Sequence, residues 1–249
     1  MSEFKYAYEK IVQSGDLLEV YQYEKMPFPP RIRKRSKRRS ERLPFKSERH
    51  IKRAVFNFRR RARANLVFGN PHMVTLTMFE IVDVAEAYAI FTQFGVRMRK
   101  EFGDAIIWIT VPEFQKRGAV HFHVLIWNLP YEIHVTERTT RTIQHLWGQG
   151  FVDIISTDGS PKLSGYLAKY MSKAMHDERL VGKKAYSCSR NALSPVSFNT
   201  ETQIAFLKDE FGIDKDPNLH PFKEREYATK WLGQARYRAF ENTIDDKLL

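Results

Sequence analysis

Apolar residues in the middle of the chain recur at two spacings, every third or fourth residue in some segments and every second residue in others. The first spacing is typical of amphipathic helices, and the second of strands with one buried face. In chain order the pattern predicts a helix over 47–65, a strand over 72–80, a helix over 83–101, strands over 104–114 and 119–128, a helix over 135–147, a strand over 151–156, a helix over 161–176 and a short strand over 184–189.

This order of elements indicates the fold class. Strand, helix, hairpin, helix, strand and helix describe an α+β layer with a mainly antiparallel sheet and helices packed on it. Ser47 and Asp83 are placed to cap their helices, and Lys116-Arg117-Gly118 supplies the turn of the hairpin. Residues 1–30 are mixed in character and end in the proline-rich segment Met26–Pro30, which we expect to break regular structure.

Two histidines on the second hairpin strand are candidates for metal binding. Side chains at i and i+2 of a strand leave the same face, so His121 and His123 converge while Phe122 points into the core. Glu113 lies on the first hairpin strand, and the hairpin brings its carboxylate toward the imidazoles. An isolated His-x-His pair also occurs for packing or at a surface, and the Glu is what favours a metal site.

Two tyrosines on the last predicted helix are candidates for nucleophilic catalysis. Tyr166 and Tyr170 are four residues apart and share a helical face, and each is followed three residues later by a lysine, Lys169 or Lys173. A phenol attacking a phosphodiester keeps the bond energy in a phosphotyrosine, and the lysines would stabilise the phenolate or hold the phosphate. A lone tyrosine pair at this spacing is also compatible with simple core packing.

Taken together, these motifs resemble those of the rolling-circle replication initiators of the HUH endonuclease superfamily. The matching elements are the His121-Phe-His123 motif, the acid eight residues upstream, the strand that contains Thr75 and Thr77, and the paired tyrosines. The resemblance runs from about Arg49 to Arg190, including Arg53-Ala, Arg63-Ala-Asn65 and Ala185–Arg190. It implies a ferredoxin-like or RNA-recognition-motif-like core, a topology that periodicity alone does not predict.

The resemblance also implies an activity. A chain of this kind is expected to nick one strand of origin DNA, to remain linked to the 5′ end through tyrosine, and to rejoin the strand after replication. It implies a divalent metal ion, Mg²⁺ or Mn²⁺, held by Glu113, His121 and His123, and imidazole with carboxylate is also compatible with Zn²⁺. Relatives with two such tyrosines are thought to alternate them. A transposase or relaxase, or a non-catalytic DNA-binding regulator on the same fold, is the alternative.

The basic residues are concentrated in one segment. Between Arg31 and Arg63 the chain has sixteen Lys or Arg and two acids, whereas the other 216 residues carry 25 basic and 27 acidic groups. Such an arm suits a polyanion, with salt-sensitive binding, although a solvated basic tail or a localisation signal has the same composition. The residues we expect to contact DNA are Arg31, Arg33, Lys34, Arg35, Lys37, Arg38, Arg39, Lys52, Arg53, Arg59, Arg60, Arg61 and Arg63.

Composition narrows the remaining choices. The single cysteine, Cys188, excludes an internal disulfide, and we expect a cytoplasmic protein without a membrane span or signal peptide. The chain has no P-loop motif, so a host helicase and polymerase would act in trans on single-stranded or hairpin origin DNA. This favours a plasmid, phage or similar mobile element as the source.

We expect three parts along the chain. An N-terminal extension with the basic arm and basic helix covers 1–65, the endonuclease domain covers 66–190, and a C-terminal extension of unassigned role covers 191–249. Within these parts, Tyr186–Arg190 is predicted either to line the DNA path or to form a plain edge strand. Trp231–Arg238 is predicted to be a docking helix or a DNA contact. Asp153 and Asp177 are further acids that nothing in the sequence selects for the site.

Overall fold

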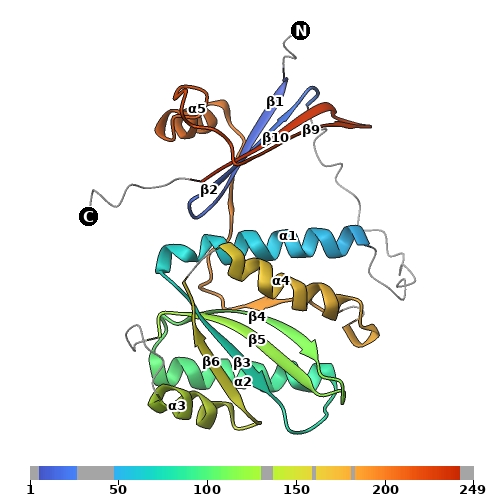
Figure 1. Ribbon diagram of the computed structural model, residues 1–249, viewed down its shortest axis with the longest axis vertical. Helices are drawn as coiled ribbons and strands as arrows, with labels where there is room; N and C mark the ends of the chain where they lie inside the picture. The colour runs from blue at the N-terminus through green and yellow to red at the C-terminus, as the bar shows by residue number, and fades with distance from the viewer. Residues whose placement is uncertain (1–5, 27–47, 130–136, 159–160, 181–182, 242–249) are drawn as a thin grey trace. The chain divides into compact units, whose positions relative to one another are not determined.

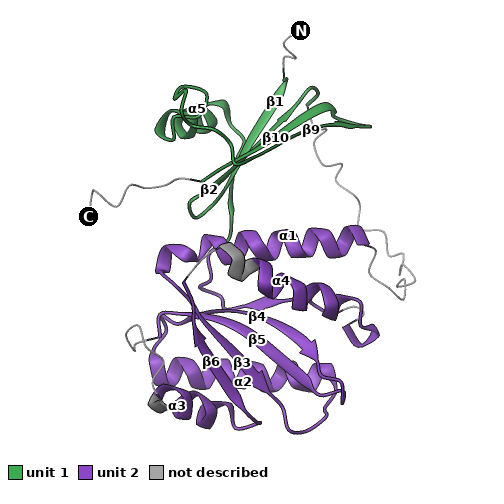
Figure 2. Cartoon of the chain, in the orientation of Figure 1, with its two compact units in different colours: residues 1–40, 194–249 green, residues 41–193 purple. Residues whose placement is uncertain are grey.

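The computed structural model describes residues 6–26, 48–129, 137–158, 161–180 and 183–241 (Figure 1). The chain divides into two compact units, residues 41–193 and a second unit formed by 1–40 together with 194–249 (Figure 2). These boundaries differ from the predicted ones at 65 and 190, because the basic helix packs within the central unit and the two ends of the chain share a sheet. No described helix combines the length and the apolar character that crossing a membrane requires.

The central unit contains a five-stranded antiparallel sheet in the order β6-β3-β5-β4-β7. Its strands are β3 (His72–Thr77), β4 (Ile107–Phe114), β5 (Val120–Trp127), β6 (Val152–Ser156) and β7 (Ser187–Cys188). Helix α2 (Val84–Phe102) connects β3 to β4, and α3 (Glu137–Trp147) connects β5 to β6. This β-α-β-β-α-β order, with β6 beside β3, is the expected ferredoxin-like arrangement.

Helices cover both faces of this sheet (Figure 1). One core joins α2 and α3 to the face that carries Phe122 and Val124. A second core joins α1 (Glu48–Ala64) and α4 (Pro161–Met175) to the opposite face, which carries Ile109 and Leu125. Because neighbouring strand residues point to opposite faces, the α1 and α4 side also receives His121 and His123.

All nine predicted elements are present in the central unit, and Asp83 caps α2 by accepting from the amides of Ala85 and Glu86. The predicted cap Ser47 lies outside the described residues. Two short 3₁₀ turns, Leu66–Phe68 and Glu178–Leu180, complete the unit. Gly95 in α2 is required by packing, since a Cβ there would lie 2.7 Å from the Trp108 ring.

The second unit contains another five-stranded antiparallel sheet, in the order β8-β1-β2-β10-β9. Its elements are β1 (Tyr8–Ser14), β2 (Leu17–Tyr23), β8 (Val196–Phe198), β9 (Lys223–Thr229), β10 (Gly233–Glu241) and helix α5 (Glu201–Glu210). α5 packs on one face through a core that includes Ile11, Leu18 and Ile204. The predicted docking helix at Trp231–Arg238 is therefore wrong, because this segment forms a turn and most of β10, whose alternate residues Ala235 and Ala239 are buried.

Candidate active site

The β4–β5 hairpin sets the position of the acidic residue. Its turn is closed by the Gln115 amide, which donates to the Ala119 carbonyl at 2.9 Å, and by Gly118, whose φ of +98° is a conformation that glycine adopts readily. The resulting register places Glu113 directly opposite His121. The predicted hairpin is confirmed, and it brings the carboxylate beside the histidine strand.

His123 is the most enclosed residue of the predicted set, with 6% of its surface exposed. Its Nε2 donates to Glu113 Oε2 at 2.8 Å, and its Nδ1 lies 3.4 Å from Thr75 Oγ1. The Tyr170 ring stacks on the imidazole with centroids 4.1 Å apart. Thr75, which the sequence presents only as part of a matching strand, therefore contacts a predicted metal ligand directly.

Glu113 also has a cationic partner. Lys173 Nζ lies 2.6 Å from Glu113 Oε1. Burial alone would raise the pKa of the Glu113 carboxyl, but the hydrogen bonds from Lys173 and His123 outweigh it and hold that pKa below its usual value. The carboxylate is therefore ionised and shared between an imidazole and an ammonium group.

The two tyrosine hydroxyls meet at one place. The Tyr166 and Tyr170 hydroxyls are hydrogen-bonded to each other, and their rings are 4.9 Å apart in an edge-to-face arrangement. This hydrogen bond, with burial and the nearby Glu113, raises the pKa of Tyr170 to about 12. Tyr170 lies against His123, whereas Tyr166 is 43% exposed. One helical face thus presents both phenols beside the Glu113–His123 pair.

The structure separates the two lysines that the sequence treats alike. Lys173 contacts Glu113, whereas Lys169 lines a groove between α1 and α4, together with Lys52 and Arg59 of α1. Since residues i+3 and i+7 of a helix differ in direction, only the second lysine follows the face of the tyrosines. Lys173 is thus placed at the acid, and Lys169 at the surface.

The donor set fits a divalent cation in kind. His121 Nε2 is buried without a hydrogen-bond partner among the described residues, and burial near His123 lowers the pKa of His121 and favours the neutral imidazole that ligates metals. The spacing is not closed, since the two imidazole centroids are 6.3 Å apart. In the described part of the chain, no three His, Cys, Asp or Glu side chains are grouped tightly enough to hold a metal ion. Binding therefore requires side-chain rotation.

The two further acids lie outside these contacts. Asp177 is paired with Arg179, with Oδ2 2.6 Å from the guanidinium, so it is engaged away from the histidines. Asp153 is exposed on β6, in register with Thr75 on the face that carries His123. Neither shares a hydrogen bond with Glu113 or the histidines among the described residues.

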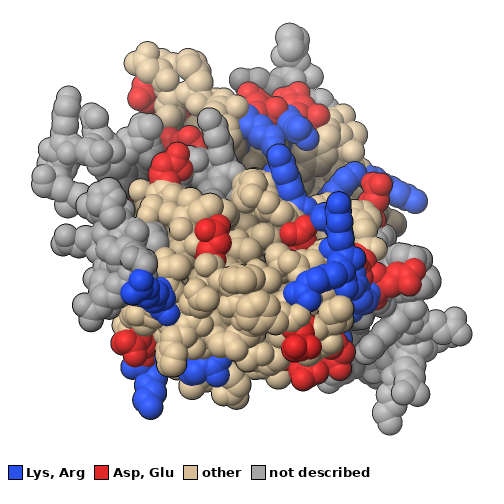
Figure 3. Space-filling view, turned by 60° about the horizontal axis from the view of Figure 1, so that its bottom comes forward, with Lys and Arg blue, Asp and Glu red and all other residues tan. Residues whose placement is uncertain are grey.

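The basic helix has cations on both flanks. Arg53 and Arg61 line a pocket against the β7 segment, and Lys52 and Arg59 line the groove against α4. Arg60 covers the Phe56 ring at 4.2 Å. By contrast, Figure 3, which turns the α2 and α3 side of the central unit toward the viewer, shows Lys and Arg scattered among Asp and Glu. The predicted arm residues from Arg31 to Arg39 lie outside the described residues.

The fold and the grouped motifs define an α+β protein with a histidine pair, an acid and a tyrosine helix on one sheet face. Residues 71–175, from the start of β3 to the end of α4, match a family of replication-associated proteins that is named after the protein ORF2. The match includes Glu113, both histidines and both tyrosines, and it is consistent with the predicted resemblance to rolling-circle replication initiators. No curated protein and no solved structure matches the chain.

Proposed function

We propose that this chain is a site-specific, metal-dependent DNA nicking and strand-transfer enzyme that initiates rolling-circle replication. The observation that carries the proposal is the meeting of the Tyr166 and Tyr170 hydroxyls beside the Glu113–His123 pair, within the segment that matches a replication-associated family. A phosphodiester held there lies within reach of a nucleophile and of charged groups that can stabilise it.

In the proposed reaction, a tyrosine Oη attacks the phosphorus of the scissile phosphodiester. The bond from phosphorus to the 3′ oxygen breaks, the phenolic proton is lost to solvent, and the 3′ oxygen takes up a proton. The 5′ phosphate stays on the tyrosine, and a later 3′ hydroxyl reverses the step. The second tyrosine is placed to make the second attack.

The chain's own residues position the reactants. Glu113, His121 and His123 would hold a divalent cation, which supplies charge stabilisation to the phosphate when bound. Thr75 orients the His123 ring, and the stacked Tyr170 ring fixes its plane. Lys173 offers an ammonium group to the phosphate or the phenolate once it leaves Glu113.

The experiment is a search for a covalent protein–DNA adduct. The full chain is incubated with Mn²⁺ and single-stranded oligonucleotides that tile the DNA encoding it, and the products are separated on a denaturing gel. An adduct whose DNA maps to one position, and which needs the metal, supports a site-specific initiator. DNA binding without an adduct at any tile would favour the non-catalytic regulator.

A further inference from the structure

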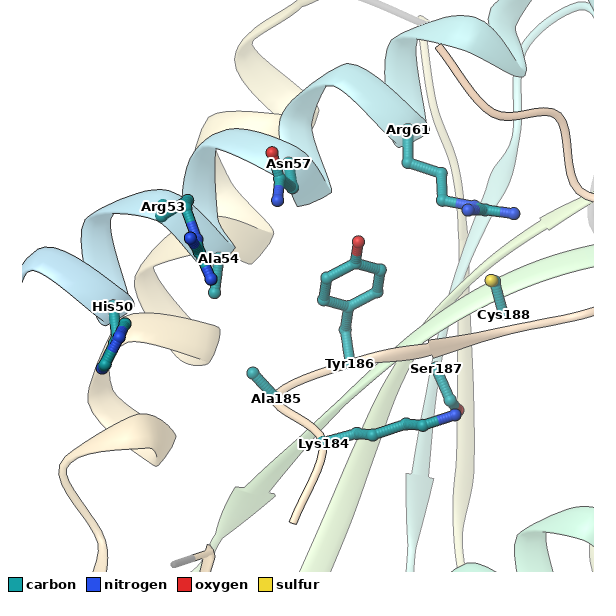
Figure 4. A pocket seen from close by; sticks show the side chains of 10 residues that line it. All are labelled: His50, Arg53, Ala54, Asn57, Arg61, Lys184, Ala185, Tyr186, Ser187 and Cys188. Carbon is teal, nitrogen blue, oxygen red and sulfur yellow. The ribbon is translucent and has the colours of Figure 1, made fainter. Parts of the chain in front are cut away.

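A second cationic site lies in the same unit, away from the tyrosines. A pocket of about 440 Å³ opens between α1 and the β7 segment. This volume is within the range of about 300–1,000 Å³ typical of small-molecule sites. Figure 4 shows its walls, and the lining residues are His50, Arg53, Ala54, Asn57, Arg61, Lys184, Ala185, Tyr186, Ser187 and Cys188.

The charge of this pocket is of one sign. Three of its ten lining residues, Arg53, Arg61 and Lys184, are permanent cations, and none is acidic. Within the described part of the chain, the side chains of Arg53 and Lys184 have no carboxylate partner. Arg61 donates from Nη2 to the Ala192 carbonyl at 3.0 Å, while its Nε is buried without a partner among the described residues. The pocket therefore suits an anion and has donors available to bind it.

The walls are anchored before any ligand arrives. The Lys184 carbonyl accepts from the Tyr88 hydroxyl at 3.0 Å, and the Ser189 amide donates to the Trp108 carbonyl at 2.9 Å. The Tyr186 ring packs edge-on against Phe58, with centroids 5.6 Å apart, and its hydroxyl points into the pocket in Figure 4. The aromatic surface is thus held at a fixed distance from the cations.

We propose that this pocket binds one nucleotide unit of single-stranded DNA, with the base against Tyr186 and the phosphates on Arg53 and Lys184. An aromatic ring beside cations is the arrangement that single-strand binding uses, because every base has a π-face and every linkage a charge. Asn57 and Ser187 add polar groups for base edges. α1 also follows the basic arm directly in sequence. The inference rests on the proposed DNA substrate, and it places a second grip on that strand.

The test measures binding without cleavage. Tyr166→Phe/Tyr170→Phe protein is titrated with a fluorescent single-stranded oligonucleotide in EDTA. Tyr186→Leu should weaken binding about 5- to 100-fold, whereas Tyr186→Phe, which keeps the ring, should bind nearly as tightly as its parent. The double change Arg53→Gln/Lys184→Gln should lower the slope of log affinity against log salt by about 1.4. Lys100→Gln, an exposed cation on α2, is the matched control.

Two further measurements identify the ligand. Ultraviolet crosslinking of DNA that carries 5-iododeoxyuridine should attach it to the peptide containing Tyr186. Affinities of Tyr186→Leu and Arg53→Gln/Lys184→Gln equal to that of Lys100→Gln would overturn the proposal. So would an equal dependence of duplex DNA binding on Tyr186, or binding of a free deoxynucleoside monophosphate alone. Wild-type protein that shows these binding effects but forms no adduct would refute the nicking activity and leave the pocket standing.

Discussion

At the scale of single residues, Glu113 joins the histidine strand to the tyrosine helix. One carboxylate oxygen accepts from His123 and the other from Lys173. A cation that binds the carboxylate has to replace at least one of these partners. Lys173 is 70% exposed, so its ammonium group can turn into water at little packing cost. The lysine therefore balances the carboxylate until a metal and a phosphate take its place.

Removing a metal ligand should abolish chemistry without abolishing DNA binding. We expect His121→Ala, His123→Ala and Glu113→Ala each to slow adduct formation by about 100-fold or more, and Thr75→Val, which acts through His123, by about 10- to 100-fold. Gel assays with saturating DNA measure the rates, and an exposed histidine on α3, in His145→Ala, serves as the control. Any ligand variant that forms adduct at the wild-type rate is thereby excluded from the site.

The two lysines should separate in the same assay. Lys173→Met removes the ammonium group at Glu113 and should slow adduct formation at least about 10-fold, whereas Lys169→Met, in the α1–α4 groove, should chiefly weaken DNA binding. Rates at saturating DNA, compared with affinities in EDTA, distinguish the two effects. Equal defects in both variants would show that the helix turns during binding.

The tyrosines make the sharpest residue-scale prediction. Because both hydroxyls meet at one place, Tyr166→Phe and Tyr170→Phe should each retain adduct formation, and only the double variant should lose it. Joining after a second cleavage should fail in either single variant, since one nucleophile is then already linked to DNA. Mass spectrometry of the trapped peptide locates each linkage. A covalent adduct in the double variant would refute the tyrosine mechanism.

Much of this site could be predicted because it depends on local periods. The two-residue repeat of β5 and the glycine turn bring the histidines and Glu113 together, and the helical repeat aligns the tyrosines. The different positions of Lys169 and Lys173 could not be predicted, because they depend on how α4 rotates against the sheet. Nor could the pocket at Tyr186, whose walls come from segments more than 120 residues apart in sequence.

At the scale of secondary structure elements, the difference between the two units has the same origin. The central unit joins strands through helices and a tight hairpin, and its periodicity predicted every element. In the second unit, β2 pairs with β10, so Tyr21 lies opposite Tyr237. Pairing over such a distance in sequence leaves no local signal, and the alternation in β10 is too short to distinguish a strand from part of a helix.

One ion-pair cluster ties α5 to the sheet of the second unit and makes its stability depend on pH. Asp214 accepts from Arg238 of β10 and Lys208 of α5. The hydrogen bonds from Arg238 and then Lys208 lower the pKa of Asp214 from 3.8 to about 2. A carboxyl with a lowered folded-state pKa stabilises the fold above its unfolded pKa, and the contribution is lost as pH falls through the folded value.

Asp214→Asn should therefore lower the melting temperature at neutral pH. Because Asp214 is 45% exposed, we expect about 1 kcal/mol or less after solvent screening, or up to about 4 °C. The gap between wild type and variant should narrow between about pH 4 and pH 2. Thermal melts followed by circular dichroism at about pH 7, 4 and 2.5 measure it, and Asp216→Asn is a nearby control. A gap that stays constant with pH would contradict the assignment.

At the scale of the whole molecule, the basic arm joins two folded units. The arm follows β2 in sequence, and α1 follows the arm, so the segment from Arg31 to Lys46 runs between a strand of one unit and a helix of the other. Deleting residues 1–46 would remove the arm but also β1 and β2, and β2 is the central strand of its sheet. Reduced DNA affinity in such a deletion would not distinguish missing charge from missing structure.

Charge neutralisation separates these effects. We expect replacement of Arg31, Arg33, Lys34, Arg35, Lys37, Arg38, Arg39, Arg42 and Lys46 by Gln to leave the folded units intact, because both strands and α1 are retained. Affinity for DNA should fall, and the slope of log affinity against log salt should drop by about 0.7 to 0.9 for each phosphate that the arm no longer neutralises. Adduct formation at high oligonucleotide concentration should persist, since the tyrosines and the Glu113–His123 pair are unchanged. Binding measured from about 50 to 300 mM salt, with circular dichroism as the check on folding, tests this. An unchanged salt slope would show that the arm does not contact DNA and that the cations of α1 carry the electrostatic attraction.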